Sequence, residues 1–206
     1  MIPEMISNPS SMLSGSLLGS VVLLALTALA GFVFSLVSKA VYTILGAVFG
    51  NRFAFIFANG LAVPGVLHHE LSHAIAALLT GARVRSFTII PRDGALGQVG
   101  IVPRGSKLMQ GLQLSFSAVA PVLFGIGTLL LSLQYILPSL NAPWQHILFW
   151  YLIVCLVLHM TLSGADWKNF LRGILGTWII LFAVCFVLQL AGLDFLGTLK
   201  SVIPAR

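Results

Sequence analysis

The stretch VPGVLHHELSHAIAALLT, residues 63–80, decides how the rest of the chain is interpreted. It is apolar except for a short run of ionisable side chains near its middle, which includes His69, Glu70 and His73. On a helix, side chains four residues apart lie on the same face, so the two histidines project together. Gly81, directly after the stretch, is a typical helix stop. The stretch therefore predicts an apolar helix with a polar site on one face.

The composition around this helix is that of an integral membrane protein. Of the 206 residues, 58% are hydrophobic and only 8% are charged. Such a composition excludes an ordinary soluble domain. A helix needs about 20 apolar residues to cross roughly 30 Å of hydrocarbon. Four stretches that contain no Asp, Glu, Lys or Arg are residues 5–38, 53–69, 108–165 and 173–193. We therefore expect an all-α polytopic membrane protein with about five or six transmembrane helices, folded as a single domain over residues 1–206.

The individual elements follow from apolar length and from helix breakers. The predicted apolar segments are residues 16–50, 54–80, 110–137, 144–163 and 173–192. The first is either one long tilted helix or a span followed by an interfacial piece. In the second, Pro64 either kinks a helix or starts one, because it lacks the N–H and has a fixed φ. Residues 83–103 differ from all of these, since they contain β-rich pieces on both sides of Asp93-Gly94, a turn signal. They predict a small β hairpin.

The basic residues indicate the orientation in the membrane. They gather in two loops that two predicted spans separate, and an excess of Lys and Arg marks cytoplasmic loops. These residues are Arg83, Arg85, Arg92, Arg104 and Lys107 in one loop, and Lys168 and Arg172 in the other. The hairpin then lies on the cytoplasmic side, with His73 about 10 Å deep at 1.5 Å of rise per residue. We expect a multi-pass protein of a prokaryotic inner membrane, with its site toward the cytoplasm. The net charge of +6 reflects these loops, and no nucleic-acid partner is expected.

The polar run has the pattern HExxH, which is typical of zinc hydrolases. His69 and His73 are the expected ligands of one Zn²⁺ ion per chain, with Glu70 beside a water on the metal. Zinc lowers the pKa of such a water to about 7, and the carboxylate accepts its proton as the water attacks a peptide carbonyl. An ionisable group within a span is costly unless it has a function, so a purely structural role for this cluster is disfavoured.

A catalytic zinc site usually has a third protein ligand. The metzincin pattern requires glycine at 76 and histidine at 79, where the chain has alanine and leucine, and no glutamate follows Glu70. Asp166 is the favoured third ligand, because it adjoins an apolar segment on the cytoplasmic side. The remaining candidates are Asp93, which a role in the hairpin turn explains well, Asp194, His68, His146 and His159. His68 points roughly 100° away from His69, which suits a residue that lines the cavity.

These motifs resemble those of the site-2 protease family of intramembrane metalloproteases. The resemblance covers about residues 54–172: an HExxH motif in one span, a β-containing loop, a further span, and a span that ends near an aspartate. It implies that His69, His73 and Asp166 bind zinc and that Glu70 is the catalytic base. The chain has Ala165-Asp166-Trp167 where the family typically has an LDG motif, and Ala120-Pro121 with Phe124 where the family has a GPxxN-like element.

The expected partners are the lipid bilayer, a membrane-protein substrate with a transmembrane helix, and a regulatory membrane protein. A transmembrane helix must unwind before a peptide bond can be attacked, and the hairpin at 86–102 offers strand addition to the exposed backbone. A purely structural hairpin at the headgroup level remains an alternative. The second functional hypothesis is a zinc-binding membrane protein without proteolytic activity, such as a metal transporter or an inactive scaffold. A transporter favours ionisable residues along several spans, whereas the acids here lie near one face.

Overall fold

The computed structural model describes residues 9–89 and 97–192. Helices dominate it, and the only regular exception among the described residues is one pair of short strands. The elements in chain order are α1 (Pro9–Phe49), α2 (Asn51–Ile56), a π-helical segment (Phe57–Leu61), α3 (Val63–Leu79), β1 (Arg83–Thr88), β2 (Gln98–Val102), α4 (Lys107–Leu131), a π-helical segment (Ser132–Ile136), a short 3₁₀ turn (Leu137–Ser139), α5 (Pro143–His159), α6 (Gly164–Arg172) and α7 (Ile174–Leu190).

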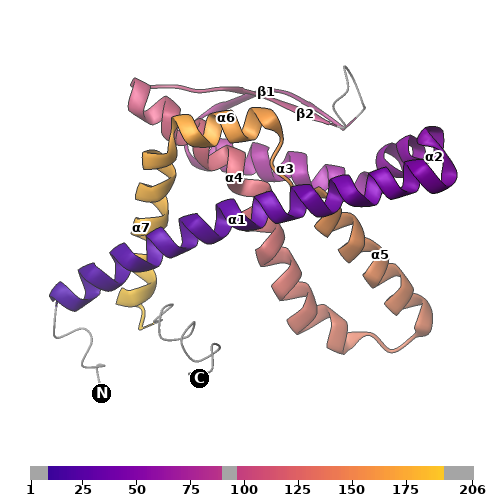
Figure 1. Cartoon of the computed structure of the whole chain (residues 1–206). Coiled ribbons are helices and arrows are strands. Elements are labelled where there is room, and N and C mark those ends of the chain that lie inside the picture. Colours follow the sequence, from indigo (N-terminus) through magenta and orange to yellow (C-terminus); the bar gives the residue numbers. More distant parts are fainter. Residues whose placement is uncertain (1–8, 90–96, 193–206) are drawn as a thin grey trace.

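Helix α3 packs against both α4 and α5 with one face and leaves Leu71, Ile75 and Leu78 exposed on the other (Figure 1). The short helix α6 packs against α4 at the end of the molecule where the strands lie, away from the turn that joins α4 to α5. Helix α1 crosses the bundle along its outside, packs against α7 and also contacts α4 and α5. The helix with the HExxH motif therefore contacts elements from much later in the chain.

Local sequence explains where these helices begin and end. Pro64 lies in the first turn of α3, where its missing N–H costs nothing, so it starts this helix and does not kink it. Gly81 follows the end of α3 with a φ of 85°. This is the left-handed conformation that glycine adopts without strain. The first apolar segment forms a single long helix, α1, which resolves the two alternatives that the sequence left open.

The predicted hairpin is confirmed as a two-stranded antiparallel sheet. β1 and β2 pair from Arg83 opposite Val102 to Thr88 opposite Gln98. The turn signal Asp93-Gly94 falls in the segment between residues 89 and 97, outside the described residues. β2 also contacts α3, so the hairpin lies against the helix that bears the HExxH motif.

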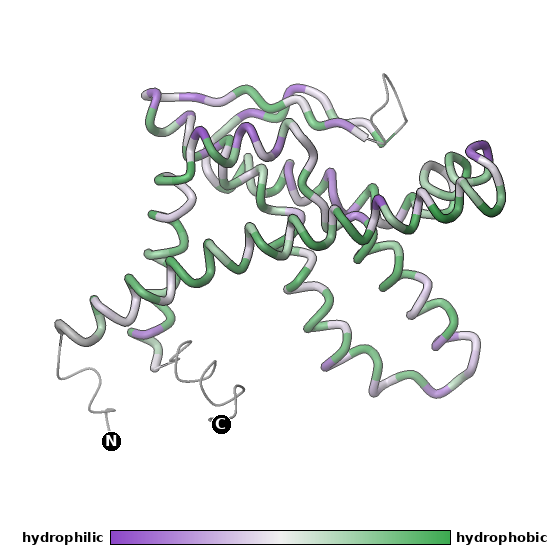
Figure 2. The backbone as a smooth tube through the Cα atoms, in the orientation of Figure 1, coloured by the Kyte–Doolittle hydropathy of each residue, from purple (hydrophilic) through white to green (hydrophobic). Residues whose placement is uncertain are grey.

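The helices that could cross a membrane are fewer than the five or six predicted. Among the described residues, Met12–Phe49 and Lys107–Ser139 are long and apolar enough, and the bent pair Pro143–His159 and Gly164–Arg172 makes a third if it counts as one span. The pair bends by 61°, so Asp166 lies on a separate helix and not at the end of the fourth span. The second predicted segment is divided by a π-helical segment, which leaves α3 with 17 residues. Hydrophobic residues predominate along the long helices, and many of the hydrophilic residues lie in the strands and in α6 (Figure 2).

Candidate metal centre

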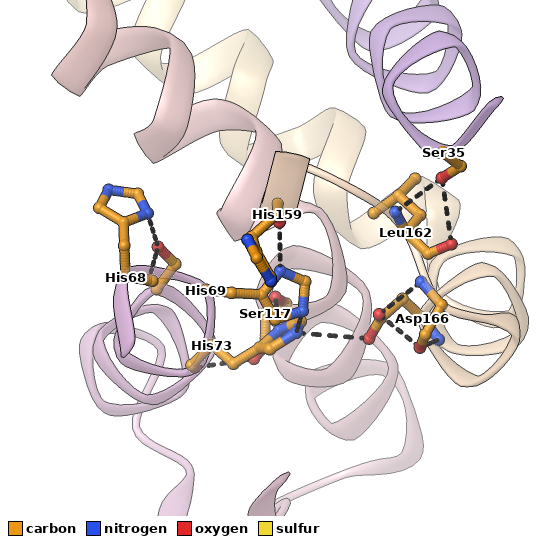
Figure 3. Close-up of polar contacts among 10 residues, drawn as sticks. Ser35, His68, His69, His73, Ser117, His159, Leu162 and Asp166 are labelled. Carbon is orange, nitrogen blue, oxygen red and sulfur yellow. Dashed lines mark hydrogen bonds and ion pairs between the residues drawn. The ribbon is translucent and has the colours of Figure 1, made fainter. Parts of the chain in front are cut away.

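His69 and His73 lie one turn apart on α3, and each is oriented by a backbone carbonyl of another helix (Figure 3). The Nδ1 atom of His69 lies 2.7 Å from the carbonyl oxygen of His159, and that of His73 lies 2.7 Å from the carbonyl oxygen of Ser117. A carbonyl oxygen only accepts, so Nδ1 carries the proton in both rings. In a neutral imidazole the other nitrogen, Nε2, then holds a lone pair. The two Nε2 atoms face each other at 3.1 Å.

Asp166 reaches the same point from the first turn of α6 (Figure 3). Its Oδ2 atom accepts hydrogen bonds from the backbone N–H of Ser163, at 2.9 Å, and from the Ser163 hydroxyl. The Asp166 N–H in turn donates to the Ser163 hydroxyl oxygen at 3.1 Å, which completes a capping box. This box uses only one carboxylate oxygen. The other, Oδ1, lies 3.6 Å from Nε2 of His73.

This arrangement fits a metal ion. One ligand atom from each of His69, His73 and Asp166 lies within 4.8 Å of the others. Two imidazole nitrogens bound to one tetrahedral zinc ion at about 2.05 Å lie roughly 3.3 Å apart, close to the 3.1 Å between the two Nε2 atoms. Two lone pairs cannot bond to each other, so a cation between them is the partner that they lack. Three ligands leave one tetrahedral position open, as in catalytic zinc sites.

The charges around the cluster also favour a divalent cation. Glu70 and Asp166 are 6% and 9% exposed, and the two histidines bring no charge when they are neutral. Within the described parts of the chain, neither carboxylate forms an ion pair with a lysine or an arginine. Two buried carboxylates without a counter-ion are costly. An ion of charge +2 would balance them.

Glu70 lies beside the three candidate ligands and is not one of them. Its place is set by Gly97, which precedes β2. A Cβ atom at position 97 would lie 2.7 Å from Cγ and 2.8 Å from Oε1 of Glu70. The bare glycine backbone thus packs directly against the carboxylate, so the start of β2 and the glutamate are fitted to each other.

A cavity of about 660 Å³ opens over these side chains. Its walls come from α3, β2, α4, the link between α5 and α6, and α6 itself. They are formed by Val66, His69, Glu70, His73, Gly97, Gln98, Val99, Ile101, Leu114, Ser117, Ala118, His159, Thr161, Ser163, Ala165, Asp166 and Asn169.

The other candidate ligands do not join the cluster. His68 points away from it (Figure 3), and its Nε2 atom lies 3.1 Å from the Thr128 hydroxyl. The Nδ1–H of His159 donates to the Cys155 carbonyl, and this residue orients His69 through its own carbonyl. His146 lies in the first turn of α5, outside the group. Asp93 and Asp194 lie outside the described residues.

Sequence reasoning missed several residues of the site. The carbonyls of His159 and Ser117 and the backbone of Gly97 leave no mark in a sequence, because any residue type supplies a carbonyl. Asn169, one turn after Asp166 on α6, lines the cavity, and no described residue hydrogen-bonds to its side-chain amide. Ser163 was identifiable, because a serine three residues before an acid predicts a capping box.

No family model matches this chain, and no curated protein or solved structure is similar to it. The chemistry of the site therefore has to be worked out from its own residues.

Proposed function

We propose that this chain is an intramembrane zinc metalloprotease of the site-2 protease type, which hydrolyses peptide bonds within or near transmembrane segments of membrane proteins. The observation that carries the proposal is that three candidate ligands lie together and that a second acid, which is not one of them, lines the same cavity. One ligand atom from each of His69, His73 and Asp166 lies within 4.8 Å of the others, and Glu70 lines the same cavity. A site that only stores a metal has no need for a carboxylate that lies in the same cavity and is not a ligand.

Each residue has a distinct role in the proposed reaction. His69, His73 and Asp166 hold the ion, and the carbonyls of His159 and Ser117 keep the two imidazoles in the tautomer that binds it. A bound zinc ion acidifies a water ligand and polarises a carbonyl. Glu70 accepts the proton of the attacking water and delivers it to the leaving amine. The Asn169 amide, which has no partner among the described residues, donates to the substrate carbonyl as negative charge develops on it.

The apolar surface supports a membrane location for this chemistry. The helices that could cross a bilayer carry large exposed hydrophobic side chains along their length. Described basic residues occur in β1, in the loop after β2 and in α6, and these elements lie at one end of the molecule (Figure 1), which suits a cytoplasmic face. We propose a multi-pass protein of a prokaryotic inner membrane whose site opens toward the cytoplasm.

The substrate in this proposal is a transmembrane segment that unwinds and adds to the hairpin. β2, and not β1, supplies cavity-lining residues, among them Val99 and Ile101. These two residues are two positions apart and so lie on one face of the strand. In the described sheet β2 pairs only with β1, so no described strand occupies its other edge, and we propose that the substrate pairs there. Strand addition there replaces the hydrogen bonds that the substrate helix gives up.

The proposal is tested with purified protein in lipid vesicles, using a panel of single-span membrane proteins as substrates. We expect the wild type to cleave at least one of them, and Glu70→Gln to bind Zn²⁺ with wild-type stoichiometry and to lose cleavage by at least about 1,000-fold. His69→Ala should lose Zn²⁺ binding. The neighbouring variant His68→Ala serves as the matched control and should keep both properties. Equal cleavage by Glu70→Gln and the wild type would refute the protease assignment, and zinc binding without any cleavage would favour a transporter or an inactive scaffold.

A further inference from the structure

The N-terminal helix α1 is hydrogen-bonded to the segment between α5 and α6 through Ser35. The hydroxyl oxygen of Ser35 accepts the backbone N–H of Leu162 at 3.1 Å, across 127 residues of sequence (Figure 3). The hydroxyl proton lies between two acceptors, the Gly31 carbonyl at 2.7 Å in the same helix and the Leu162 carbonyl at 3.4 Å. Both backbone groups of Leu162 are therefore held by one side chain of α1.

Leu162 belongs to the link between α5 and α6, and this link carries the contacts that orient two candidate ligands. His159, just before the link, accepts the Nδ1–H of His69 with its carbonyl. Ser163, just after Leu162, holds the carboxylate of Asp166. A shift of Leu162 would thus move the support of His69 and the support of Asp166 together.

The side chain of Leu162 packs against α1 close to the place where the Leu162 backbone is hydrogen-bonded to Ser35. It is 5% exposed and packs over Gly31, one turn before Ser35. A Cβ atom at position 31 would lie 2.6 Å from Cδ1 and 2.7 Å from Cγ of Leu162. Only glycine leaves room for the leucine at this place, so the link is fixed to α1 by packing and by hydrogen bonding.

The link needs such a support because it has no regular structure of its own. Residues between α5 and α6 are neither helical nor extended in a sheet. A buried backbone N–H without a partner costs about 1–3 kcal/mol, and in a bilayer irregular backbone is tolerated only where protein covers it. The Ser35 hydroxyl supplies the partner that the Leu162 N–H lacks.

We propose that Ser35 is a positioning residue of the metal centre, which fixes the α5–α6 link and, through it, the spacing between His69 and Asp166. This inference rests on the metal site proposed above. In this proposal the position of α1 relative to the link affects the geometry of the metal site, although α1 itself contributes no ligand. A membrane partner that displaced α1 would change the site without touching it.

The test measures metal binding, so it does not depend on knowing a substrate. Zn²⁺ affinity is measured by competition with a chromophoric chelator, and coordination geometry by the visible absorption of Co²⁺ bound in place of zinc. For Ser35→Ala we expect about 10-fold weaker Zn²⁺ binding, the lower end of the effect of groups that orient ligands, and a changed Co²⁺ spectrum. Ser35→Thr keeps the hydroxyl and should restore both properties.

The matched control is Ser20→Ala. Ser20 is another serine of α1 and is fully buried, but its hydroxyl bonds to Leu17 of its own helix, so this variant should bind both metals like the wild type. If Ser35→Ala does not fold, Gly31→Ala tests the same contact by pushing Leu162 off α1, and it should shift the Co²⁺ spectrum in the same way. A wild type that binds neither metal would overturn the metal site itself. Normal binding and an unchanged spectrum in both Ser35→Ala and Gly31→Ala would overturn only the role of Ser35.

Discussion

The contact between Gly97 and Glu70 leads to the sharpest prediction about catalysis. In Gly97→Ala the new methyl group would lie 2.7 Å from Cγ and 2.8 Å from Oε1 of Glu70, whereas ordinary contacts begin at 3.4 Å. Either the carboxylate or the start of β2 must therefore move by about 0.7 Å, and a displacement of about 1 Å in a catalytic group can cost 100-fold in rate. The φ of Gly97 is not in the left-handed region, so alanine brings no backbone strain.

We expect Gly97→Ala to lower kcat by about 10- to 100-fold and to leave Zn²⁺ affinity unchanged, because Glu70 is not among the three ligands. The assay compares initial cleavage rates and Zn²⁺ affinity for the same preparation. Gly127→Ala is the control, since a Cβ atom there meets nothing within 4 Å. A Gly97→Ala protein that cleaves at the wild-type rate would refute the placement of Glu70 against β2. Loss of zinc together with activity would show that the strand supports the ligands instead.

Two further predictions concern the substrate. Asn169→Ala should lower kcat by about 100-fold without loss of zinc, because this is the usual cost of losing one donor to a developing oxyanion. Asn141→Ala, at the turn between α4 and α5, is the control, and equal effects of the two substitutions on kcat would exclude a specific role for Asn169. Val99→Pro removes a backbone N–H from β2 and should reduce cleavage at least about 10-fold if substrates add to this strand. If this variant cleaves all substrates at the wild-type rate, the hairpin has a structural role only.

The parts of the site that follow from local geometry were predictable from the sequence. Residues four apart on a helix share a face whatever surrounds them, so the pairing of His69 and His73 needs no tertiary information. The hairpin was predictable for a similar reason, since alternation and turn signals are local. Asp166 is far from His73 in the sequence, and it was found by excluding other acids and by resemblance. That reasoning placed it correctly beside the histidines but wrongly at the end of a straight span.

The number of spans was not predictable from apolar runs alone. A charge-free stretch shows that a segment tolerates hydrocarbon, but it does not show whether the segment is one straight helix. The break in residues 54–80 is a π-helical segment, and the apolar residues 144–163 extend into the irregular link that Ser35 supports. The link depends on a partner far away in the sequence, which the apolar length of a single span does not reveal.

The difference between local and distant determinants also applies to the proposed metal site. Metal ligands and a general base are side chains of particular types, so a sequence exposes them. The groups that orient them are mostly backbone carbonyls and glycines of α4, α5 and the start of β2. Such groups cannot be recognised from the sequence, because every residue type has a backbone carbonyl. Each candidate ligand is thereby tied to a different neighbouring element: His69 to α5, His73 to α4, and Asp166 to the link that α1 holds. A metal ion at this point would join α3, which bears the two histidines, to α6, which bears Asp166, so removal of the metal should loosen the contact between these two parts of the fold and not the site alone.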